Sequence, residues 1–247
     1  MEILSFEEFA PLFGPWADLF RPFIESKAMF DIYARLKSDA QKEIIVPKSE
    51  NVFRTFATSH PDNIKSIWYL MDPYPKRYKT RVPHATGIAM DCSNSPDGKM
   101  QPSLEKFYDG LSKDIDKEVE RSLSLEYLNN QGVMMLNTDL TCKLAKTGSH
   151  DKVWEPFQKF FLEEIMGQKT GIIYVLAGKN SHRMEKFITP IGNYILKVDH
   201  PVSASYKNTD WDTKNVFSLT NKILKENKGK TIFWDKKEWD YENKPLF

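Results

Sequence analysis

The chain has 247 residues, 40% of them hydrophobic and 28% charged, a balance typical of a globular protein and not of a disordered or fibrous one. Its 35 Lys and Arg residues against 34 Asp and Glu residues leave a net charge of +1, so a nucleic-acid-binding face would have to be a local patch. Two cysteines, Cys92 and Cys142, with no C-x-x-C motif and no His pair at metal-ligand spacing, argue against a disulfide framework, structural zinc and iron–sulfur clusters.

The N-terminal sequence carries acidic residues where a secretory signal would carry positive charge, and its apolar run is interrupted. The longest strongly apolar stretch, Ile172 to Ala177, is far shorter than the roughly 20 residues that span a bilayer. We therefore expect a soluble, intracellular protein of a reducing compartment, in the cytoplasm or nucleus, or in a host cell if the source is a virus. We expect no association with a membrane.

From Phe6 to about Ala40, apolar residues recur at helical spacing and predict packed N-terminal helices, two in number, within residues 1–40. Four later segments are short, apolar and followed by turn residues, which predicts strands. These strands span 64–71, 132–136, 171–177 and 193–198. Helical patterns predict helices over 103–121, 151–166, 180–188 and 213–225.

Strands that alternate with helices predict one α/β domain over residues 1–247, with a central four-stranded, mostly parallel sheet flanked by helices on both faces. The chain after Thr231 is rich in Lys, Glu, Asp and Trp. This composition predicts a segment at the surface, with a surface tail at 235–247.

Polar groups follow each of the four predicted strands. Asp72 follows the first strand, Asn137 ends the second, Gly178 to Asn180 follow the third, and His200 follows the fourth. Taken singly, a turn acid, a helix cap and a structural histidine are ordinary explanations of these residues. Because ligands of open α/β sheets bind at the carboxyl ends of the strands, the four groups together predict a functional site at one edge of the sheet.

Motifs at these positions resemble those of the family 1 uracil-DNA glycosylases, in the same order from about Phe13 to Trp234. The family's Gly-Gln-Asp-Pro-Tyr-His motif corresponds to Leu70–Pro75, and its Gly-Val-Leu-Leu-Leu-Asn strand to Gly132–Asn137. Further matches are Gly87–Met90, Pro102–Leu104, Leu140–Trp154 and His200–Ser205. Asp-Pro-Tyr-Pro-Lys at 72–76 and Leu-Thr-Cys-Lys-Leu at 140–144 are most similar to the poxvirus-type branch.

The resemblance implies hydrolysis of the bond between uracil and its sugar in DNA, in base-excision repair, with no metal and no cofactor. Asp72 would stabilise the sugar cation and position the attacking water. His200 would work as a neutral imidazole that donates a hydrogen bond to O2 of the departing uracil. Asn137 would read the base edge, and Tyr74 would exclude the methyl group of thymine.

Four positions depart from the family pattern. Met71 replaces Gln and Pro75 replaces His, both with precedent in the poxvirus-type branch. Met90 stands where a Phe stacks on the base, so base affinity or discrimination would be lower. Ala204 stands where a Leu wedges into the duplex, which predicts a preference for single-stranded substrate unless a neighbour such as Tyr206 or Trp211 serves as the wedge.

The resemblance also predicts residues that contact the DNA backbone. The basic run after the catalytic acid comprises Lys76, Arg77, Lys79 and Arg81, although a solvated charged loop would have the same composition. The other predicted DNA contacts lie in loops: Pro102, Ser103, Gly178, Lys179, Asn180, Ser203, Ala204 and Ser205.

Two other functions remain open at this point. Met71 and Met90 would also suit a glycosylase for a modified pyrimidine, although Tyr74 argues against bulky groups at C5. The poxvirus-type relatives join a polymerase processivity complex. The third possibility is therefore a DNA-binding replication module with residual or no glycosylase activity. The partner expected in any case is DNA, single- or double-stranded, and the poxvirus-type resemblance adds a replication protein as a candidate partner.

Overall fold

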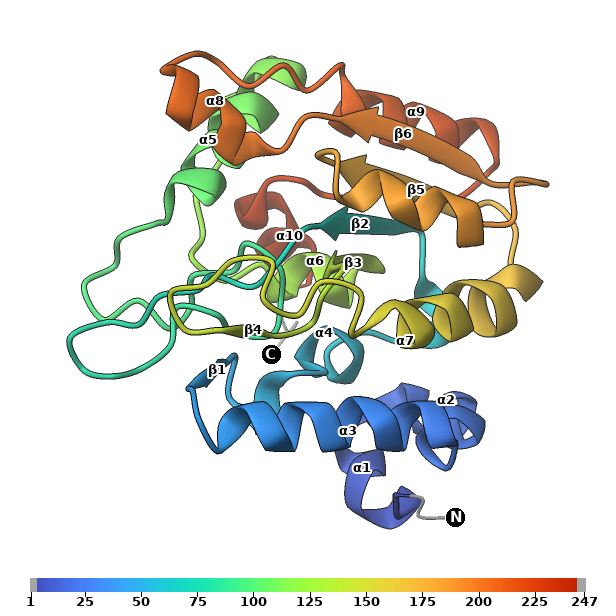
Figure 1. The fold of residues 1–247 in the computed structure, drawn as a ribbon. Helices are drawn as coiled ribbons and strands as arrows, with labels where there is room; N and C mark the ends of the chain where they lie inside the picture. Colours follow the sequence, from blue (N-terminus) through green and yellow to red (C-terminus); the bar gives the residue numbers. More distant parts are fainter. Residues whose placement is uncertain (1–3, 244–247) are drawn as a thin grey trace.

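The computed structural model describes residues 4–243, and a four-stranded sheet forms its centre (Figure 1). The strands are β2 (Ser66–Leu70), β3 (Val133–Asn137), β5 (Ile173–Ala177) and β6 (Tyr194–Val198). Their order is β3-β2-β5-β6, and every neighbouring pair is parallel. The predicted α/β class and central parallel sheet are confirmed. Because the strands are parallel and in register, their carboxyl ends meet at one edge.

Alternate side chains of the strands enter two different hydrophobic cores, one on each face of the sheet. Ile67 and Tyr69 of β2 join the first core, whereas Trp68 and Leu70 join the second. Burial on both faces explains why β2, β3 and β5 are largely apolar without polar alternation. The edge strand β6 is only partly buried and includes the exposed Lys197.

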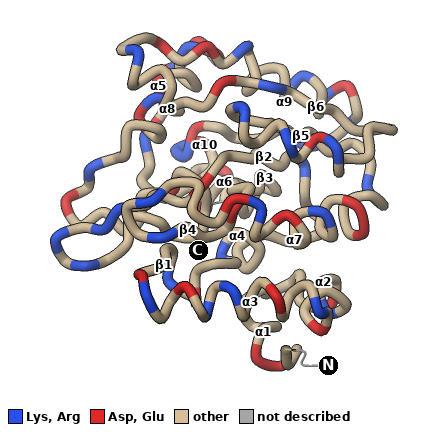
Figure 2. The backbone as a smooth tube through the Cα atoms, viewed as in Figure 1, with Lys and Arg blue, Asp and Glu red and all other residues tan. Residues whose placement is uncertain are grey.

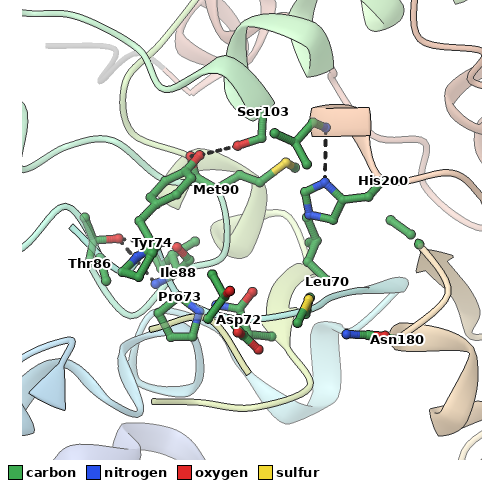
Figure 3. A pocket seen from close by; sticks show the side chains of 18 of the residues that line it. Leu70, Asp72, Pro73, Tyr74, Thr86, Ile88, Met90, Ser103, Asn180 and His200 are labelled. Atoms are coloured by element: carbon green, nitrogen blue, oxygen red, sulfur yellow. Dashed lines mark hydrogen bonds between the residues drawn. The ribbon is translucent and has the colours of Figure 1, made fainter. Parts of the chain in front are cut away.

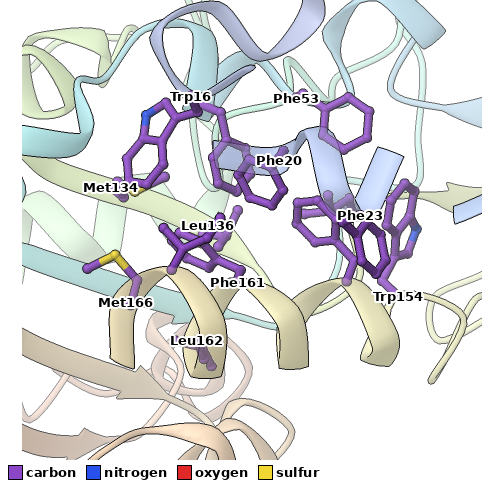
Figure 4. Close-up of a cluster of buried hydrophobic side chains, with 14 of the residues drawn as sticks. Trp16, Phe20, Phe23, Phe53, Met134, Leu136, Trp154, Phe161, Leu162 and Met166 are labelled. Carbon is purple, nitrogen blue, oxygen red and sulfur yellow. The ribbon is translucent and has the colours of Figure 1, made fainter. Parts of the chain in front are cut away.

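The first core lies between the sheet and the N-terminal helices α1 (Phe6–Phe13), α2 (Ala17–Ile24) and α3 (Lys27–Ala40), with α4 (Arg54–Ala57) and α7 (Glu155–Phe160). It is rich in aromatic rings (Figure 4), and Phe20 and Phe157 stack with their ring centroids 5.0 Å apart. The prediction of two helices here was wrong. Gly14, at φ +54°, ends α1, and a 3₁₀ turn over Gly14–Trp16 joins it to α2.

The second core lies on the opposite face, under α5 (Pro102–Asp114), α6 (Glu126–Asn130) and α9 (Val216–Glu226). The chain after Thr231 was predicted to lie on the surface, but Ile232 and Trp234 are buried in this core. The helix α10 (Lys236–Glu242) that follows has no buried residue. The last part of the predicted tail, 244–247, lies outside the described residues.

Other boundaries also differ from the prediction. The helix predicted over 103–121 ends at Asp114. The one predicted over 151–166 begins at Glu155 and continues as a short π-helix (Phe161–Ile165) and a 3₁₀ turn (Met166–Gln168). The segment 180–188 forms a 3₁₀ helix, η6 (Ser181–Phe187). The helices α4, α6 and α10 were not predicted. Further elements that were not predicted are β1 (Ile45–Val46), β4 (Cys142–Lys143), α8 (Pro201–Lys207) and the 3₁₀ turns η2 (Ser49–Asn51) and η3 (Pro61–Asn63). Within residues 4–243, no helix is long and apolar enough to cross a membrane.

Candidate active site

A cavity of about 420 Å³ opens at the carboxyl ends of the strands (Figure 3). Residues after all four strands line it: Asp72 after β2, Asn137 at the end of β3, Gly178 to Asn180 after β5, and His200 after β6. The structure thus brings together the polar groups that the sequence placed at the strand ends. Met71, Tyr74, Met90 and Ser103 also line the cavity.

The carboxylate of Asp72 is held by the backbone of a distant loop. Its Oδ2 accepts a hydrogen bond from the N–H of Gly148, whereas its Oδ1 is buried without a hydrogen-bond partner among the described residues. Burial raises the pKa of Asp72 above its ordinary value, and the Gly148 hydrogen bond and the Arg183 charge oppose this rise. Asp72 therefore has one free oxygen, which is suited to bind a water molecule or a developing positive charge.

His200 precedes α8 and caps its first turn. The Nδ1 atom accepts a hydrogen bond of 3.1 Å from the N–H of Val202 (Figure 3), so in the neutral ring the proton is on Nε2. Burial lowers the pKa of His200 to about 4, and the imidazole is neutral at pH 7. Gly178 is required beside it, because a Cβ atom there would lie 2.9 Å from the His200 Cβ.

The ring of Tyr74 is fixed by its hydroxyl group. Its Oη donates to the carbonyl of Met90 at 3.1 Å and shares a hydrogen bond of 2.6 Å with Ser103 Oγ (Figure 3). Met90 itself is buried and has a left-handed backbone, at φ +61°. The hydroxyl group of Ser103 is buried and faces Tyr74, so it is not presented to DNA, and the predicted DNA contact of Ser103 through its backbone stays a prediction.

The backbone of Asn137 is anchored from the first core. Gln158 Nε2 donates to the carbonyl oxygens of Asn137 and Thr138, at 3.0 and 3.1 Å, and Gln158 Oε1 accepts from Tyr69 Oη at 2.9 Å. The side-chain amide of Asn137 forms no hydrogen bond with the residues that the structure describes, and it lines the cavity. Its donor and its acceptor are thus both available to a ligand.

The basic run forms a hairpin beside the cavity, between Pro75 and Ala85, which both line it. Backbone hydrogen bonds join Tyr78 to Val82 and His84 to Lys76, and the rings of Tyr78 and His84 stack 4.0 Å apart. The four cations of this hairpin are exposed, and none forms a salt bridge with a described residue: Lys76, Arg77, Lys79 and Arg81. In Figure 2 this loop is a mostly blue segment.

Ala204, the residue at the position of the family's wedge leucine, is not the side chain that α8 presents to solvent. Ala204 is 4% exposed and its methyl group packs in the second core, so this side chain is not presented to DNA, and its predicted DNA contact stays a prediction. Trp211 is also 4% exposed, and its indole N–H donates to the carbonyl of Asp199 at 2.8 Å. Tyr206, by contrast, is 84% exposed and lies at the cavity. It is the aromatic side chain that this segment presents to solvent.

The other predicted DNA contacts lie around the same opening. Lys179 and Asn180 are exposed and line the cavity with Gly178, and Pro102 is exposed at the start of α5. The hydroxyl groups of the two serines are used within the protein: Ser203 Oγ donates to the carbonyl of His200, and Ser205 Oγ donates to that of Pro102. The backbone N–H groups of Gly178 and Ser203 also donate within the protein, so the exposed side chains of Lys179 and Asn180 are what this rim offers to an anion.

Sequence reasoning missed the partners of Asp72. Gly148 lies 76 residues after Asp72, inside a segment that matched the family without any role assigned to it. Arg183 and Asp139, which form an ion pair next to Asp72, were not singled out either. The position of Asp139 two residues after the end of β3 was the signal that was available.

The chain resembles known proteins over most of its length. It is 30% identical over 221 residues to the uracil-DNA glycosylase of Buchnera aphidicola subsp. Acyrthosiphon pisum, which covers 89% of this chain and 97% of that protein. It is 28% identical over 232 residues to the uracil-DNA glycosylase of Fusobacterium nucleatum subsp. nucleatum, with 94% and 97% covered. The crystal structure of mimivirus uracil-DNA glycosylase matches with a TM-score of 0.81 at 25% identity and covers 94% of this chain and 90% of that one. No protein-family model matches the chain.

Proposed function

The chain belongs to the uracil-DNA glycosylase family, and we propose that its cavity holds a uracil base flipped out of DNA. The activity is hydrolysis of the N-glycosidic bond of uracil in DNA, which leaves an abasic site for base-excision repair. The observation that carries the residue assignments is the meeting of Asp72, Asn137 and His200 in one cavity of about 420 Å³. An enzyme that breaks this bond must take the base out of the stack and hold it in such a pocket.

Cleavage passes through a sugar with positive charge and a uracil with negative charge. The electron pair of the N1–C1′ bond leaves with the base, and water then adds to C1′ and gives its proton to Asp72. His200 Nε2–H donates to O2 of uracil, where the negative charge develops, so it stabilises the transition state more than the ground state. The neutral ring that burial maintains suits this role, because it donates without transferring its proton.

Asn137 supplies the base specificity in this proposal. Its free amide accepts from uracil N3–H and donates to O4, whereas cytosine has the opposite pattern at both atoms. Asn137 as a whole is 9% exposed, and a base in the cavity would cover its amide, so a mismatched base would leave buried polar atoms without partners, which is costly.

An Asn137→Asp variant is expected to gain activity on cytosine, because a buried, protonated carboxyl presents the donor and acceptor that cytosine needs. A bidentate base contact is worth about 1–3 kcal/mol, so the uracil-to-cytosine ratio of kcat/KM should fall roughly 10- to 100-fold. The ratio is measured with matched single-stranded oligonucleotides. An Asn130→Asp variant, at the exposed end of α6, is the control. An unchanged ratio in Asn137→Asp would show that this amide does not read the base.

Tyr74 favours uracil over a pyrimidine with a group at C5. Because Ser103 and the Met90 carbonyl fix its hydroxyl group, the ring cannot yield to a methyl group without breaking two hydrogen bonds. This argues against the second candidate, a glycosylase for a modified pyrimidine. Modified pyrimidines are nevertheless included in the test below, because the thioether of Met90 adapts to a differently shaped base more readily than a Phe ring.

The basic hairpin at 76–81 holds the phosphates of the DNA beside the cavity in this proposal. Its four exposed cations have no acidic partner among the described residues, so their charge is available for phosphate groups, and contact releases counterions. A net charge of +1 on the whole chain makes this patch stand out. Lys179 and Asn180 lie across the opening and complete the DNA-facing rim.

We assign the wedge role to Tyr206. A Tyr206→Ala variant is expected to lose about tenfold in kcat/KM on a U·A duplex and much less on single strands, because aromatic stacking is worth about 1–3 kcal/mol per base. Flipping costs most from a paired duplex. The control is Tyr241→Ala, which removes a tyrosine that is 73% exposed on α10.

Ala204→Leu separates this assignment from the one suggested by alignment. Because Ala204 is buried, a leucine there overpacks the core and does not reach DNA. Selective improvement of duplex substrates by Ala204→Leu, with no duplex penalty in Tyr206→Ala, would contradict the assignment to Tyr206.

The match at Asp72–Lys76 and Leu140–Leu144 supports a place in the poxvirus-type branch, and with it a replication-protein partner. An oligonucleotide panel separates the candidates, with uracil, 5-substituted uracils, thymine or cytosine in single and double strands. We expect release of uracil above all other bases. Preferred release of a 5-substituted base would favour the second candidate, and DNA binding without base release would favour a replication module.

A further inference from the structure

Arg183 lies where the ends of three strands meet. It belongs to η6, which follows β5, and its guanidinium group forms two ion pairs. Nη2 contacts Asp139, which follows β3, and Nη1 contacts Asp151, in the loop before α7. Asp139 is almost fully buried, and the Arg183 side chain is mostly buried. One side chain thus joins three segments that are far apart in the sequence.

Both acidic partners of Arg183 are hydrogen-bonded to the groups that hold Asp72. On one side, the N–H of Asp139 donates to the carbonyl of Met71 at 3.2 Å, next to Asp72. On the other side, the N–H of Asp151 donates to the carbonyl of Gly148 at 3.1 Å, and the N–H of Gly148 donates to Asp72 Oδ2. Arg183 therefore closes a ring of contacts around the carboxylate.

The charges around Asp72 give Arg183 a second effect. Asp151 disfavours the ionised form of Asp72, and Arg183 favours it. Burial, opposed by Arg183, raises the pKa of Asp139 to about 7, and the negative charges of Asp72 and Asp151 add to this rise. Cys142 in β4 also faces Asp72, but burial raises its pKa to about 12 and keeps it neutral. His200, across the cavity, is neutral because burial lowers its pKa to about 4. Lys152 and Lys179 near this site are exposed to water, which screens their charges.

We propose that Arg183 is a positioning residue for Asp72: it ties together the two loops that orient the carboxylate and compensates the negative charge of their acids. This inference rests on the proposed catalytic role of Asp72. A bidentate guanidinium is suited to the task because its fork fixes two carboxylates in one plane, which a lysine cannot do.

The test is an Arg183→Gln variant, measured in two ways. In steady-state kinetics on a uracil oligonucleotide, kcat should fall roughly 10- to 100-fold, the effect of a displaced catalytic group, with KM little changed. In substrate-free protein, carboxyl ¹³C NMR follows the titration of Asp72. Loss of the cation removes a stabilising influence on the ionised form, so the pKa of Asp72 should rise by about one unit. The acidic limb of kcat should move to higher pH with it.

Two further variants separate position from charge and from folding. Arg183→Lys keeps the charge without the fork, so the acidic limb should return towards that of wild type while kcat stays low. If the single variant does not fold, the double variant Asp139→Asn with Arg183→Gln replaces it, because neither member of the buried Arg183–Asp139 pair is then charged. Its kcat should still be reduced. Lys186→Gln is the control, because Lys186 is on the same helix but pairs with Glu155, which is not part of the ring.

An unchanged kcat and an unchanged Asp72 titration in folded Arg183→Gln would overturn the inference. An Asp72→Asn variant distinguishes this failure from a failure of the proposed function. If Asp72→Asn remains active while the Asp72 titration still responds to Arg183→Gln, the positioning contact exists but Asp72 is not the catalytic acid.

Discussion

An Asp72→Asn variant is expected to release uracil about a thousandfold more slowly than wild type, within the 10²- to 10⁴-fold contribution of a positioned acid or base. An amide keeps the size of the side chain, but it cannot stabilise a sugar cation by charge or accept the proton of the attacking water. Substrate binding should change little, because the hairpin and the base pocket are intact. Single-turnover rates under saturating enzyme report this loss without interference from product release.

The control for Asp72→Asn is Asp199→Asn. Asp199 is at the same edge of the sheet, directly before His200, and is exposed. Its removal should leave the rate within about twofold, as expected for a surface substitution away from the site. Equal rates for wild type and folded Asp72→Asn would show that the free oxygen of Asp72 has no part in the chemistry.

A His200→Ala variant is expected to lose about 10²- to 10³-fold in kcat, the usual cost of removing one donor from a site where negative charge develops. Because the pKa of His200 is lowered to about 4, the ring is neutral at every pH above that value. The wild-type rate should therefore show no step near pH 6.5, where an ordinary histidine titrates. Loss of activity towards low pH should instead follow protonation of Asp72.

The pH profile of kcat and the rate of His200→Ala are measured on the same single-stranded oligonucleotide. His60→Ala, at an exposed histidine before η3, is the control. A wild-type step near pH 6.5 that disappears in His200→Ala would contradict the neutral donor and point to a histidine that transfers its proton.

The sheet could be predicted from the sequence because each strand is a short apolar run closed by turn residues. Strand ends within one parallel sheet meet at one edge, so Asp72, Asn137 and His200 could be placed together before their geometry was known. The helix α8 could not be predicted in this way. Its sequence Pro-Val-Ser-Ala-Ser-Tyr-Lys has no apolar stripe, and its position depends on packing against α5.

The sequence alone does not show which side chains of the site are buried or which distant residues they contact. Alignment placed Ala204 at the wedge position, but only the packing of α8 shows that its methyl group points into the core. The ring that orients Asp72 depends on Arg183 and Asp151, which are 44 and 12 residues from Asp139 in the chain. No local pattern links residues that meet only after three strand ends have come together.

The central claim is tested most directly by incubating the protein with a single-stranded oligonucleotide that contains one uracil, in the presence of EDTA. The account predicts free uracil and an equimolar abasic site at an undiminished rate, with thymine and cytosine oligonucleotides left intact. The catalytic groups that it names are side chains of this chain and include no metal. Absence of uracil release from both single-stranded and duplex DNA, or loss of the release in EDTA, would contradict it.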